Sequence, residues 1–355
     1  MTVLPRRRFA RLAAASLPVS AWSASVLAQV APPRPLTRIG FGSCAYQDDP
    51  QPIWDAITTY RPDLFIFMGD NVYAALKTND LAEVQAAYAK AREVPAYMAF
   101  INRFPIMTIW DDHDYGINDG GIENPFKEQS KDEFLKFWNI PQNDPRRTRE
   151  ALYCNSTFGP NGQRLQVILM DTRWFRSPLK RTDQFGAPGK ERYVPDDDPD
   201  KTMLGDVQWQ WLRERLLEPA DVRLVISGVQ VVADGHGFER WGNFPLQRQR
   251  LYNLVGETGA NGVIFLSGDR HLGALYREKR DTPYPMIDAT SSGINRFYAA
   301  AKEPGPNRVG ALYGLPNFGT VDIDWWDRSV LLSIRDEGGQ VRRQLSVKFD
   351  ELKSG

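Results

Sequence analysis

The chain carries the segment Val263-Ile264-Phe265-Leu266-Ser267-Gly268-Asp269-Arg270-His271. It begins with four apolar residues, a run typical of a short strand that is buried on both faces of a sheet. Gly268 ends this run, and two metal-capable side chains, Asp269 and His271, follow directly. Because side chains alternate between the two faces of an extended segment, we expect Asp269 and His271 to point to the same side and Arg270 to point away from it. The segment therefore predicts a buried strand with two ligands of one metal cluster at its end.

Two further apolar runs lead to side chains that bind metals. Residues 39–41 are followed by Cys44, and residues 64–68 are followed by Asp70, with Tyr73 three positions later. A carboxylate directly after a strand can approach a cation with both oxygens, and it can bridge two cations that lie close together. Aspartate after a strand is also common as a turn or helix-capping residue. This run therefore indicates a metal site only in combination with the other runs.

A fourth run, residues 106–110, is followed by Asp111-Asp112-His113-Asp114, with Asn118 soon after. Three carboxylates around one imidazole repel one another unless a cation or hydrogen bonds compensate them. Solvated turn residues would explain one or two of these acids. Ligands in α/β sheets bind at the carboxyl ends of strands, so the four strand ends together predict one shared metal centre.

The apolar runs alternate with longer amphipathic segments. We expect strands at residues 39–41, 64–68, 106–110, 165–170, 224–227 and 263–266, and helices at 53–60, 81–104 with a break at Pro95, 130–138, 206–217 and 246–257. This alternation predicts an α/β layered domain. Residues 176–201 are dense in Pro, Gly and charged residues and predict a long surface insertion. Strands return at 320–324, 329–335 and 340–349, the last two joined by a turn at 337–339.

The composition excludes several classes of protein. With 42% hydrophobic side chains, the 355 residues are too apolar for a disordered or fibrous chain. The 44 basic residues balance 44 acidic ones, so no positive field attracts nucleic acid or an anionic membrane surface. Two cysteines, Cys44 and Cys154, are too few for a disulfide framework or a four-cysteine zinc site. Taken alone, Cys44 is explained as a small buried residue or as the disulfide partner of Cys154 in an oxidising compartment.

Residues 1–28 predict an export signal. Arg6-Arg7-Arg8-Phe9 provides a cationic start, residues 12–27 are apolar and small, and Val26-Leu27-Ala28 fits a cleavage site. Paired arginines followed by Phe9 are typical of the twin-arginine route, which carries folded proteins. The apolar stretch is short for a bilayer span, so we expect no stable membrane anchor. Residues 29–37 form an extended lead-in, and residues 38–350 form a single domain.

The strand-end motifs together resemble the alkaline phosphatase D (PhoD-like) family, a branch of the calcineurin-like metallophosphoesterases. The resemblance rests on Phe41-Gly42-Ser43-Cys44, Gly69-Asp70-Asn71-Val72-Tyr73, Trp110-Asp111-Asp112-His113-Asp114 and Ser267-Gly268-Asp269-Arg270-His271. These motifs keep the family's order between residues 38 and 295. Most of the superfamily opens with an Asp-x-His pair, whereas Cys44 with Tyr73 is similar to the D-type variant.

The resemblance implies a four-layer α/β/β/α sandwich with a metal cluster at the ends of the sheets. By analogy, a ferric ion, Fe3+, is held by Cys44, Asp70, Tyr73 and His271. Calcium, Ca2+, faces Asp70, Asn118 and Asp269, and either Asp112 or Asn118 takes the family's middle ligand position. The donor chemistry agrees, because thiolate and phenolate suit trivalent iron and carboxylate and amide oxygens suit calcium. The alternative is Zn2+ or Mn2+ in the same centre.

The expected function is that of an exported, metal-dependent phosphoesterase, periplasmic or secreted. Attack by metal-activated water would hydrolyse small-molecule phosphate monoesters, diesters or both, and the twin-arginine machinery would be the export partner. His113 or Asp112 would protonate the leaving alkoxide, and Arg173 and Arg240 would contact the phosphate. The alternative is an exported protein that binds phosphate esters or metal without turnover.

Overall fold

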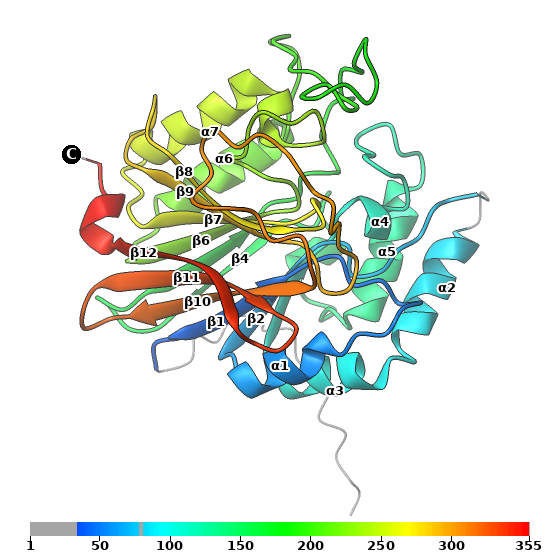
Figure 1. Cartoon of the computed structure of the whole chain (residues 1–355), viewed down its shortest axis with the longest axis horizontal. Helices are drawn as coiled ribbons and strands as arrows, with labels where there is room; N and C mark the ends of the chain where they lie inside the picture. Colours follow the sequence, from blue (N-terminus) through cyan, green and yellow to red (C-terminus); the bar gives the residue numbers. More distant parts are fainter. Residues whose placement is uncertain (1–33, 78–80, 355) are drawn as a thin grey trace, which may run out of the picture.

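The computed structural model of the chain describes residues 34–77 and 81–354. Two six-stranded sheets pack against each other, with strand order β12-β11-β10-β1-β2-β3 in the first and β4-β5-β6-β7-β9-β8 in the second. Helices α6 and α7 cover the second sheet, and α1 and α3 lie on the opposite side of the molecule, beside the first sheet (Figure 1). The structure thus confirms the α/β/β/α sandwich. The expected export signal, residues 1–28, and residues 29–33 of the lead-in lie outside the described residues.

The elements have the following bounds. The first sheet contains β1 (Arg38–Gly42), β2 (Leu64–Met68), β3 (Ile106–Ile109), β10 (Asn317–Asp324), β11 (Ser329–Asp336) and β12 (Val341–Lys348). The second contains β4 (Cys154–Phe158), β5 (Leu165–Leu169), β6 (Val222–Ser227), β7 (Val263–Ser267), β8 (Gly273–Glu278) and β9 (Met286–Ser291). The α-helices are α1 (Ile53–Tyr60), α2 (Ala82–Ala91), α3 (Pro95–Arg103), α4 (Asp112–Tyr115), α5 (Lys127–Phe137), α6 (Gly205–Leu216) and α7 (Pro245–Glu257).

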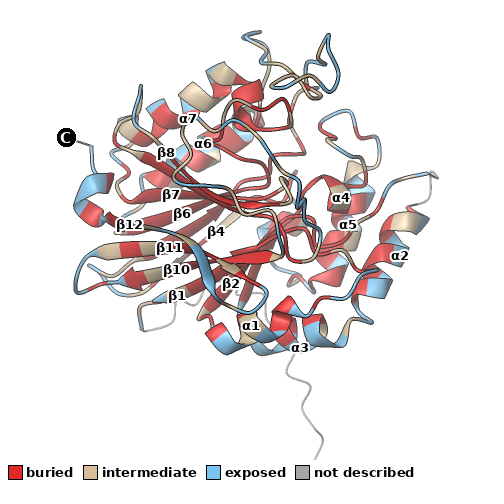
Figure 2. Ribbon diagram, in the orientation of Figure 1, coloured by how far each residue is buried: buried red, intermediate tan, exposed pale blue. Residues whose placement is uncertain are grey.

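Each sheet contains a block of neighbouring parallel strands that are buried over most or all of their length. Strands β1, β2 and β3 are parallel neighbours, and so are β5, β6, β7 and β9. Every residue of β2, β5 and β7 is buried, as the red central strands of Figure 2 show. A strand covered on both faces is apolar throughout, which is why short unbroken apolar runs predicted these elements. Parallel strands point the same way, so the residues that follow them gather at one edge of each sheet.

The sequence predicted most elements closely. The strand at 64–68 and the helix at 53–60 have the expected bounds. The predicted break at Pro95 is confirmed, since α2 ends at Ala91 and α3 begins at Pro95, where the missing N–H costs no helical hydrogen bond. The turn at 337–339 joins β11 to β12 as expected.

Three strands, β4, β8 and β9, and one short helix, α4, were not predicted. Strand β9 is buried throughout, but Asp288, Thr290 and Ser291 interrupt its apolar run. Strands β4 and β8 lie at the two edges of the second sheet and include polar, half-buried residues, so they lack the unbroken apolar run of a central strand. Helix α4 has four residues, and reciprocal hydrogen bonds between Asp111 and Asp114 define its start. A helix this short depends on side-chain capping rather than on periodicity, so its pattern is invisible in the sequence.

The expected surface insertion is an irregular segment that protrudes from the top of the molecule in Figure 1. Isolated bridges between Arg181 and Tyr193 and between Ala187 and Lys190 are its only β pairings in the described structure. Arg176, at its start, is fully buried. The insertion is therefore anchored in the interior at its first residue.

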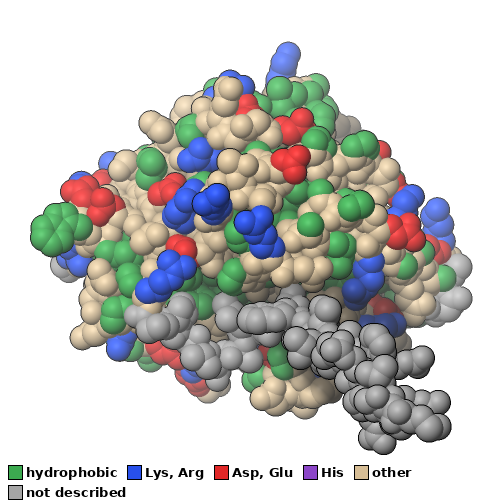
Figure 3. All heavy atoms as spheres, turned by 90° about the horizontal axis from the view of Figure 1, so that it is seen from below, with side chains coloured by type: hydrophobic (Ala, Val, Ile, Leu, Met, Phe, Trp, Pro, Cys, Tyr) green, Lys and Arg blue, Asp and Glu red, His purple; other side chains and the backbone are tan. Residues whose placement is uncertain are grey.

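The surface agrees with the balanced charge of the chain. On the face shown in Figure 3, acidic and basic side chains both occur, separated by apolar and uncharged surface. Within the described ranges, no helix is both long enough and apolar enough to cross a membrane.

Gly319 provides a test of the packing inside the first sheet. It lies opposite Phe41 in the antiparallel pair of β1 and β10, and a Cβ atom at this position would lie 2.1 Å from Phe41 Cζ. We expect Gly319→Ala to lower the free energy of unfolding by about 1–3 kcal/mol, because the buried ring would have to move. Urea unfolding measures this as a lower midpoint at an unchanged slope.

The matched control is Gly338→Ala, in the turn after β11. A Cβ atom there would meet only Asp336 Oδ1, at 3.4 Å. Its effect should stay within about 0.5 kcal/mol. Equal effects at both positions would show that contact with the ring of Phe41 does not explain the loss.

Candidate metal centre

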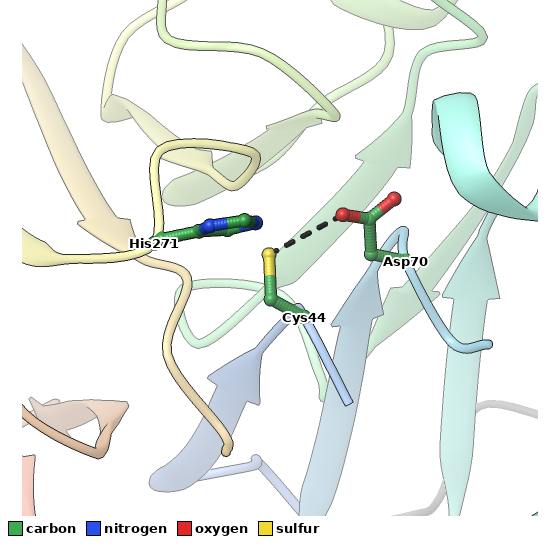
Figure 4. A group of neighbouring side chains, drawn as sticks. All are labelled: Cys44, Asp70 and His271. Atoms are coloured by element: carbon green, nitrogen blue, oxygen red, sulfur yellow. Dashed lines mark hydrogen bonds between the residues drawn. The ribbon is translucent and has the colours of Figure 1, made fainter. Parts of the chain in front are cut away.

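Loops from both sheets bring Cys44, Asp70 and His271 together. Cys44 follows β1, Asp70 follows β2 and His271 lies in the loop after β7, and Figure 4 shows the three side chains turned toward one another. One ligand atom from each lies within 4.8 Å of the others. The Sγ atom of Cys44 is 3.4 Å from Asp70 Oδ2, and the hydroxyl of Tyr73 is 3.0 Å from His271 Nε2. Four donors of different type thus surround one position.

Two further groups of candidate ligands adjoin this one. The first contains Asp70, Asp112 and His113, and the second contains Asp111, Asp112 and Asp269, each with its ligand atoms within 4.8 Å of one another. Asp70 and Asp112 each belong to two groups, so the three groups form a continuous chain of ligands. Such sharing is what a site for two or more neighbouring cations requires.

A cavity of about 280 Å³ opens beside these ligands. Its lining includes Asp112, His113, Asn118, Asp269 and His271. Both candidates for the middle ligand position, Asp112 and Asn118, therefore reach the same space. Asp112 is buried, whereas Asn118 is exposed at the mouth.

The backbone is strained at four of these positions. Cys44, Asp70, Asp269 and His271 have φ angles of 64°, 48°, 68° and 56°, in the left-handed region that side chains other than glycine rarely adopt. Such strain costs of the order of 1–3 kcal/mol at each residue and persists only where the surrounding structure imposes it. Its concentration on candidate ligands marks this edge of the sheets as a functional site.

The left-handed backbone also corrects one expectation. The segment after β7 is not extended, so alternation of side chains does not place Asp269 and His271 on one side. Because both residues are left-handed, the chain curls, and the two side chains reach different groups: His271 joins Cys44 and Asp70, and Asp269 joins Asp111 and Asp112. Asp269 and His271 still lie at the same candidate metal centre, but a left-handed backbone rather than an extended one brings them there.

Two glycines allow the strand ends to approach one another. Gly69 has a φ of 103°, and a Cβ atom on it would lie 2.2 Å from Cβ of Asp111. A Cβ atom on Gly268 would lie 2.7 Å from Ser43 Oγ and 3.0 Å from the carbonyl oxygen of Gly228. Only glycine fits where backbones come this close, so these two positions let the loops of both sheets meet at the ligands.

The electrostatics of the site call for positive charge. Burial, followed by the neighbouring carboxylates Asp112 and Asp114, raises the pKa of Asp70 well above its usual value. Burial and then Asp112 and Asp111 do the same to the pKa of Asp269. In the described part of the chain, Asp111 Oδ2 and Asp112 Oδ1 are buried without a hydrogen-bond partner. Cations bound among these oxygens would satisfy them and offset the repulsion, so the residues present fit a metal cluster.

His271 and Asp112 are suited to the role of ligand by their charge states. Burial, assisted by Arg270, lowers the pKa of His271 to about 4, which keeps the imidazole neutral, as metal binding requires. Burial tends to raise the pKa of Asp112, but His113 and Arg173 outweigh it and the pKa is lowered, so Asp112 stays ionised.

Arg173 lies beneath the centre. Its side chain is fully buried, with Nε 2.6 Å from Asp111 Oδ1 and Nη1 2.8 Å from Glu239 Oε2. Arg176 adds a second buried cation, 3.0 Å from Glu239 Oε1. Arg173 is not among the residues that line the cavity, and both of its ion pairs are internal. This geometry suits a group that orients Asp111 rather than one that touches a substrate.

Other predicted residues also have structural partners. Arg240 is buried and paired with Asp234, with Nη2 3.0 Å from Oδ1. Asp114 accepts hydrogen bonds from the backbone N–H groups of Asn71 and Asp111 and from the hydroxyl of Tyr88, so it stabilises the start of α4.

Both cysteines are free, so the structure contradicts the explanation of Cys44 as the disulfide partner of Cys154. Cys44 is completely buried beside Asp70, and the thiol is available to the centre.

Several residues of the cavity wall were not predicted from the sequence. They are Asp119, Arg192, Phe238, Glu239, Arg270 and Tyr298. Arg270 belongs to a motif already singled out, but alternation in an extended strand wrongly directed it away from the site. Arg192 lies in the insertion and Phe238 in a loop after β6, and neither has a local sequence pattern that marks it.

Comparison with known proteins places these observations in a family. The family model described as PhoD-like phosphatase matches residues 39–297. Alkaline phosphatase D of Bacillus subtilis (strain 168) is 25% identical over 244 residues, which are 61% of this chain and 40% of that protein. The chain thus spans about 40% of the length of this curated relative.

Two solved structures share the fold. One, described as the structure of PhoD, has a TM-score of 0.67 and 15% identity and covers 90% of this chain and 71% of that one. The other, the purple acid phosphatase PPD1 from yellow lupin seeds, has a TM-score of 0.59 and 11% identity and covers 89% and 54%. At these identities the likeness shows the fold alone.

Asp70→Asn tests whether the three ligand groups form one metal centre. Asparagine keeps the shape of the side chain and tolerates left-handed backbone, but it removes the charge shared by two groups. We expect metal affinity to fall by more than the ~10–100-fold typical of losing an outer partner of a ligand. Elemental analysis of purified protein, with circular dichroism to verify folding, measures the change.

Asp183→Ala is the control, because Asp183 is exposed and pairs only with Lys190 in the insertion. It should retain the metal content of the unmodified protein. A folded Asp70→Asn variant with undiminished metal would contradict the assignment of Asp70 to the centre.

Proposed function

Because the chain belongs to the PhoD-like phosphatase family, we propose that it is a metal-dependent phosphoric ester hydrolase that cleaves phosphate monoesters, diesters or both. The observation that carries this proposal is the continuous chain of ligands from Cys44 to Asp269, part of which lines a cavity of about 280 Å³. A cavity near the lower end of the ~300–1,000 Å³ usual for ligand pockets suits a phosphate ester with a compact alcohol part.

We propose that the centre holds Fe3+ and Ca2+. Cys44, Asp70, Tyr73 and His271 would hold the iron, and Asp70, Asn118 and Asp269, with Asp112 beside them, would hold the calcium. Thiolate and phenolate donors favour trivalent iron, whereas carboxylate and amide oxygens favour calcium. The hydroxyl of Tyr73, 3.0 Å from His271 Nε2, supports placing Tyr73 in the first group.

Bound cations would supply the charge that neutralises phosphoryl oxygens and lowers the pKa of an attacking water. The protein's own residues would then orient the ester and handle the proton. His113 lines the cavity, and its ring packs on Tyr73 at a centroid distance of 4.2 Å, which fixes its direction. We assign His113 the role of proton donor to the leaving alkoxide, with Asp112 as the neighbouring carboxylate. Arg173 would hold Asp111 in place from below.

The proposal includes the cellular location. Residues 1–28 carry the pattern of a twin-arginine signal, which would deliver the folded protein to the periplasm or the medium without a stable membrane anchor. Residues 38–350 would act as a single PhoD-like domain on small-molecule phosphate esters.

Colour and metal content test the iron site. Protein exported by its own signal should contain iron and be violet or brown, because thiolate and phenolate donors to ferric iron absorb visible light. Tyr73→Phe and Cys44→Ser should each shift or bleach this absorption. Colourless protein that contains zinc or manganese would support the alternative metals instead.

Hydrolysis tests the reaction. The protein should cleave p-nitrophenyl phosphate, bis-p-nitrophenyl phosphate or both. His113→Ala should lower kcat, expressed per metal-loaded protein, by roughly 10²–10⁴-fold, since it removes the proposed proton donor. Tight retention of a phosphate ester by metal-loaded protein without any turnover would favour the binding-protein alternative.

A further inference from the structure

Two arginines on the wall of the cavity, outside the ligand groups, suggest which esters it accepts. We infer that the cavity selects phosphate esters whose alcohol part carries a second anionic group, and that Arg192, Arg270 and Phe238 recognise this group. The inference rests on the proposed hydrolase function and adds a substrate class to it.

Arg270 is a buried cation with an incomplete set of partners. Its side chain is only 10% exposed, and its Nη2 lies 2.7 Å from Oε2 of Glu303, whose side chain is 5% exposed. Nε of Arg270 and Oε1 of Glu303 are buried without partners in the described structure. The guanidinium carbon lies 4.0 Å from the ring centroid of Phe238. Stacking on a ring and pairing with one carboxylate fix the guanidinium at the cavity wall while leaving donor capacity unused.

Arg192 brings a second guanidinium to the same ring. Its carbon lies 5.9 Å from the centroid of Phe238, and its Nη1 lies 2.9 Å from Asp119 Oδ2. The side chain remains 41% exposed, so one end is held while the rest is open. Although partial burial lowers it, the pKa of Arg192 is raised by Asp119 and, more weakly, by Asp269. Arg192 thus lines the cavity, where it is held by Asp119 and also senses the charge of the candidate ligand Asp269.

The cavity is lined by charges of both signs. Asp112 and Asp269 belong to the candidate ligand groups, where bound cations would take the scissile phosphate. Arg192 and Arg270 gather around Phe238 on the wall, each with a single carboxylate partner. Guanidinium groups bind carboxylates and phosphates through paired hydrogen bonds, so an anion here would gain from both. The small volume places this second anion a short distance from the ester.

A pair of isosteric esters tests the inference. The probes are 4-carboxyphenyl phosphate and its neutral amide analogue, 4-carbamoylphenyl phosphate, with 1,4-phenylene bisphosphate to separate a second phosphate from a carboxylate. The unmodified enzyme should prefer the carboxylate over the amide by about tenfold in kcat/KM, the order expected for one charge-assisted hydrogen bond. Intrinsic reactivity of the two esters cancels when the preference is compared between variants.

Matched variants separate anion recognition from loop support. Arg192→Gln keeps a donor near Asp119 but removes the charge, and it should reduce the preference to about twofold or less. Tyr193→Phe removes the other hydrogen bond to Asp119 Oδ2, of 2.8 Å, without changing charge, so any loss should affect both esters equally. Glu303→Gln frees Arg270 from its carboxylate and should increase the preference. Lys190→Ala, in the exposed part of the insertion, is the control for the insertion as a whole.

The outcomes are distinguishable. Equal use of the two isosteres by the unmodified enzyme, or an equal loss for both in Arg192→Gln, would overturn the inference and leave the hydrolase function intact. No hydrolysis of any phosphate ester by metal-loaded protein would contradict the proposed function, and this inference with it. A preference for the bisphosphate alone would identify the second anion as phosphate rather than carboxylate.

Discussion

Four carboxylates, the buried Asp70, Asp111 and Asp112 and the partly buried Asp269, meet where the ends of the two sheets adjoin, and their mutual repulsion is the constraint that organises the site. Among them, only Asp111 has a direct ion pair with a cation in the described part of the chain, namely Arg173. Carboxyl groups that share a dry site either take up protons or are compensated by external cations. Since His271 and Cys44 stand beside them as typical metal donors, compensation by cations accounts for the whole set of residues.

The sheets supply the rigidity that this crowding needs. Cys44, Asp70, Asp269 and His271 all have left-handed backbone, and each lies in the loop after a parallel strand that is buried over all or nearly all of its length. A strained loop between flexible elements would relax and move its side chain away. Strands buried on both faces hold the loop ends in place, so the strain can persist at the ligands. The stability of the parallel strands thus offsets the backbone strain and the charge repulsion at the candidate ligands.

The sequence was sufficient for the fold and for which residues meet, but not for how they meet. Apolar runs such as residues 64–68 are unambiguous because a central parallel strand has no solvent face. The edge strands β4 and β8 were not predicted, because a half-exposed strand tolerates polar residues and so lacks a continuous apolar run. At the site, motif spacing identified Asp269 and His271, whereas their left-handed backbone is a conformation that no local sequence pattern reports. For the same reason the internal ion pairs of Arg173 and the position of Arg192 on the cavity wall emerged only from the three-dimensional structure.

Asp119 connects the insertion to the candidate ligands. Its backbone N–H donates to Asp112 Oδ2 at 2.7 Å, while its own carboxylate accepts from Arg192 and from the hydroxyl of Tyr193. Its carbonyl oxygen accepts a hydrogen bond from the buried Arg176. Arg176, Arg192 and Tyr193, all in the insertion, therefore donate hydrogen bonds to Asp119. Asp119 in turn orients the candidate ligand Asp112. Insertions on the surface usually vary without consequence for the interior, but here a shift of the segment would move Asp112 as well as Arg192. Asp119 thus links Arg192, which would help to select the alcohol part of the substrate, to Asp112, which would help to hold the cation. A change in this segment that alters substrate preference would therefore also alter the metal centre.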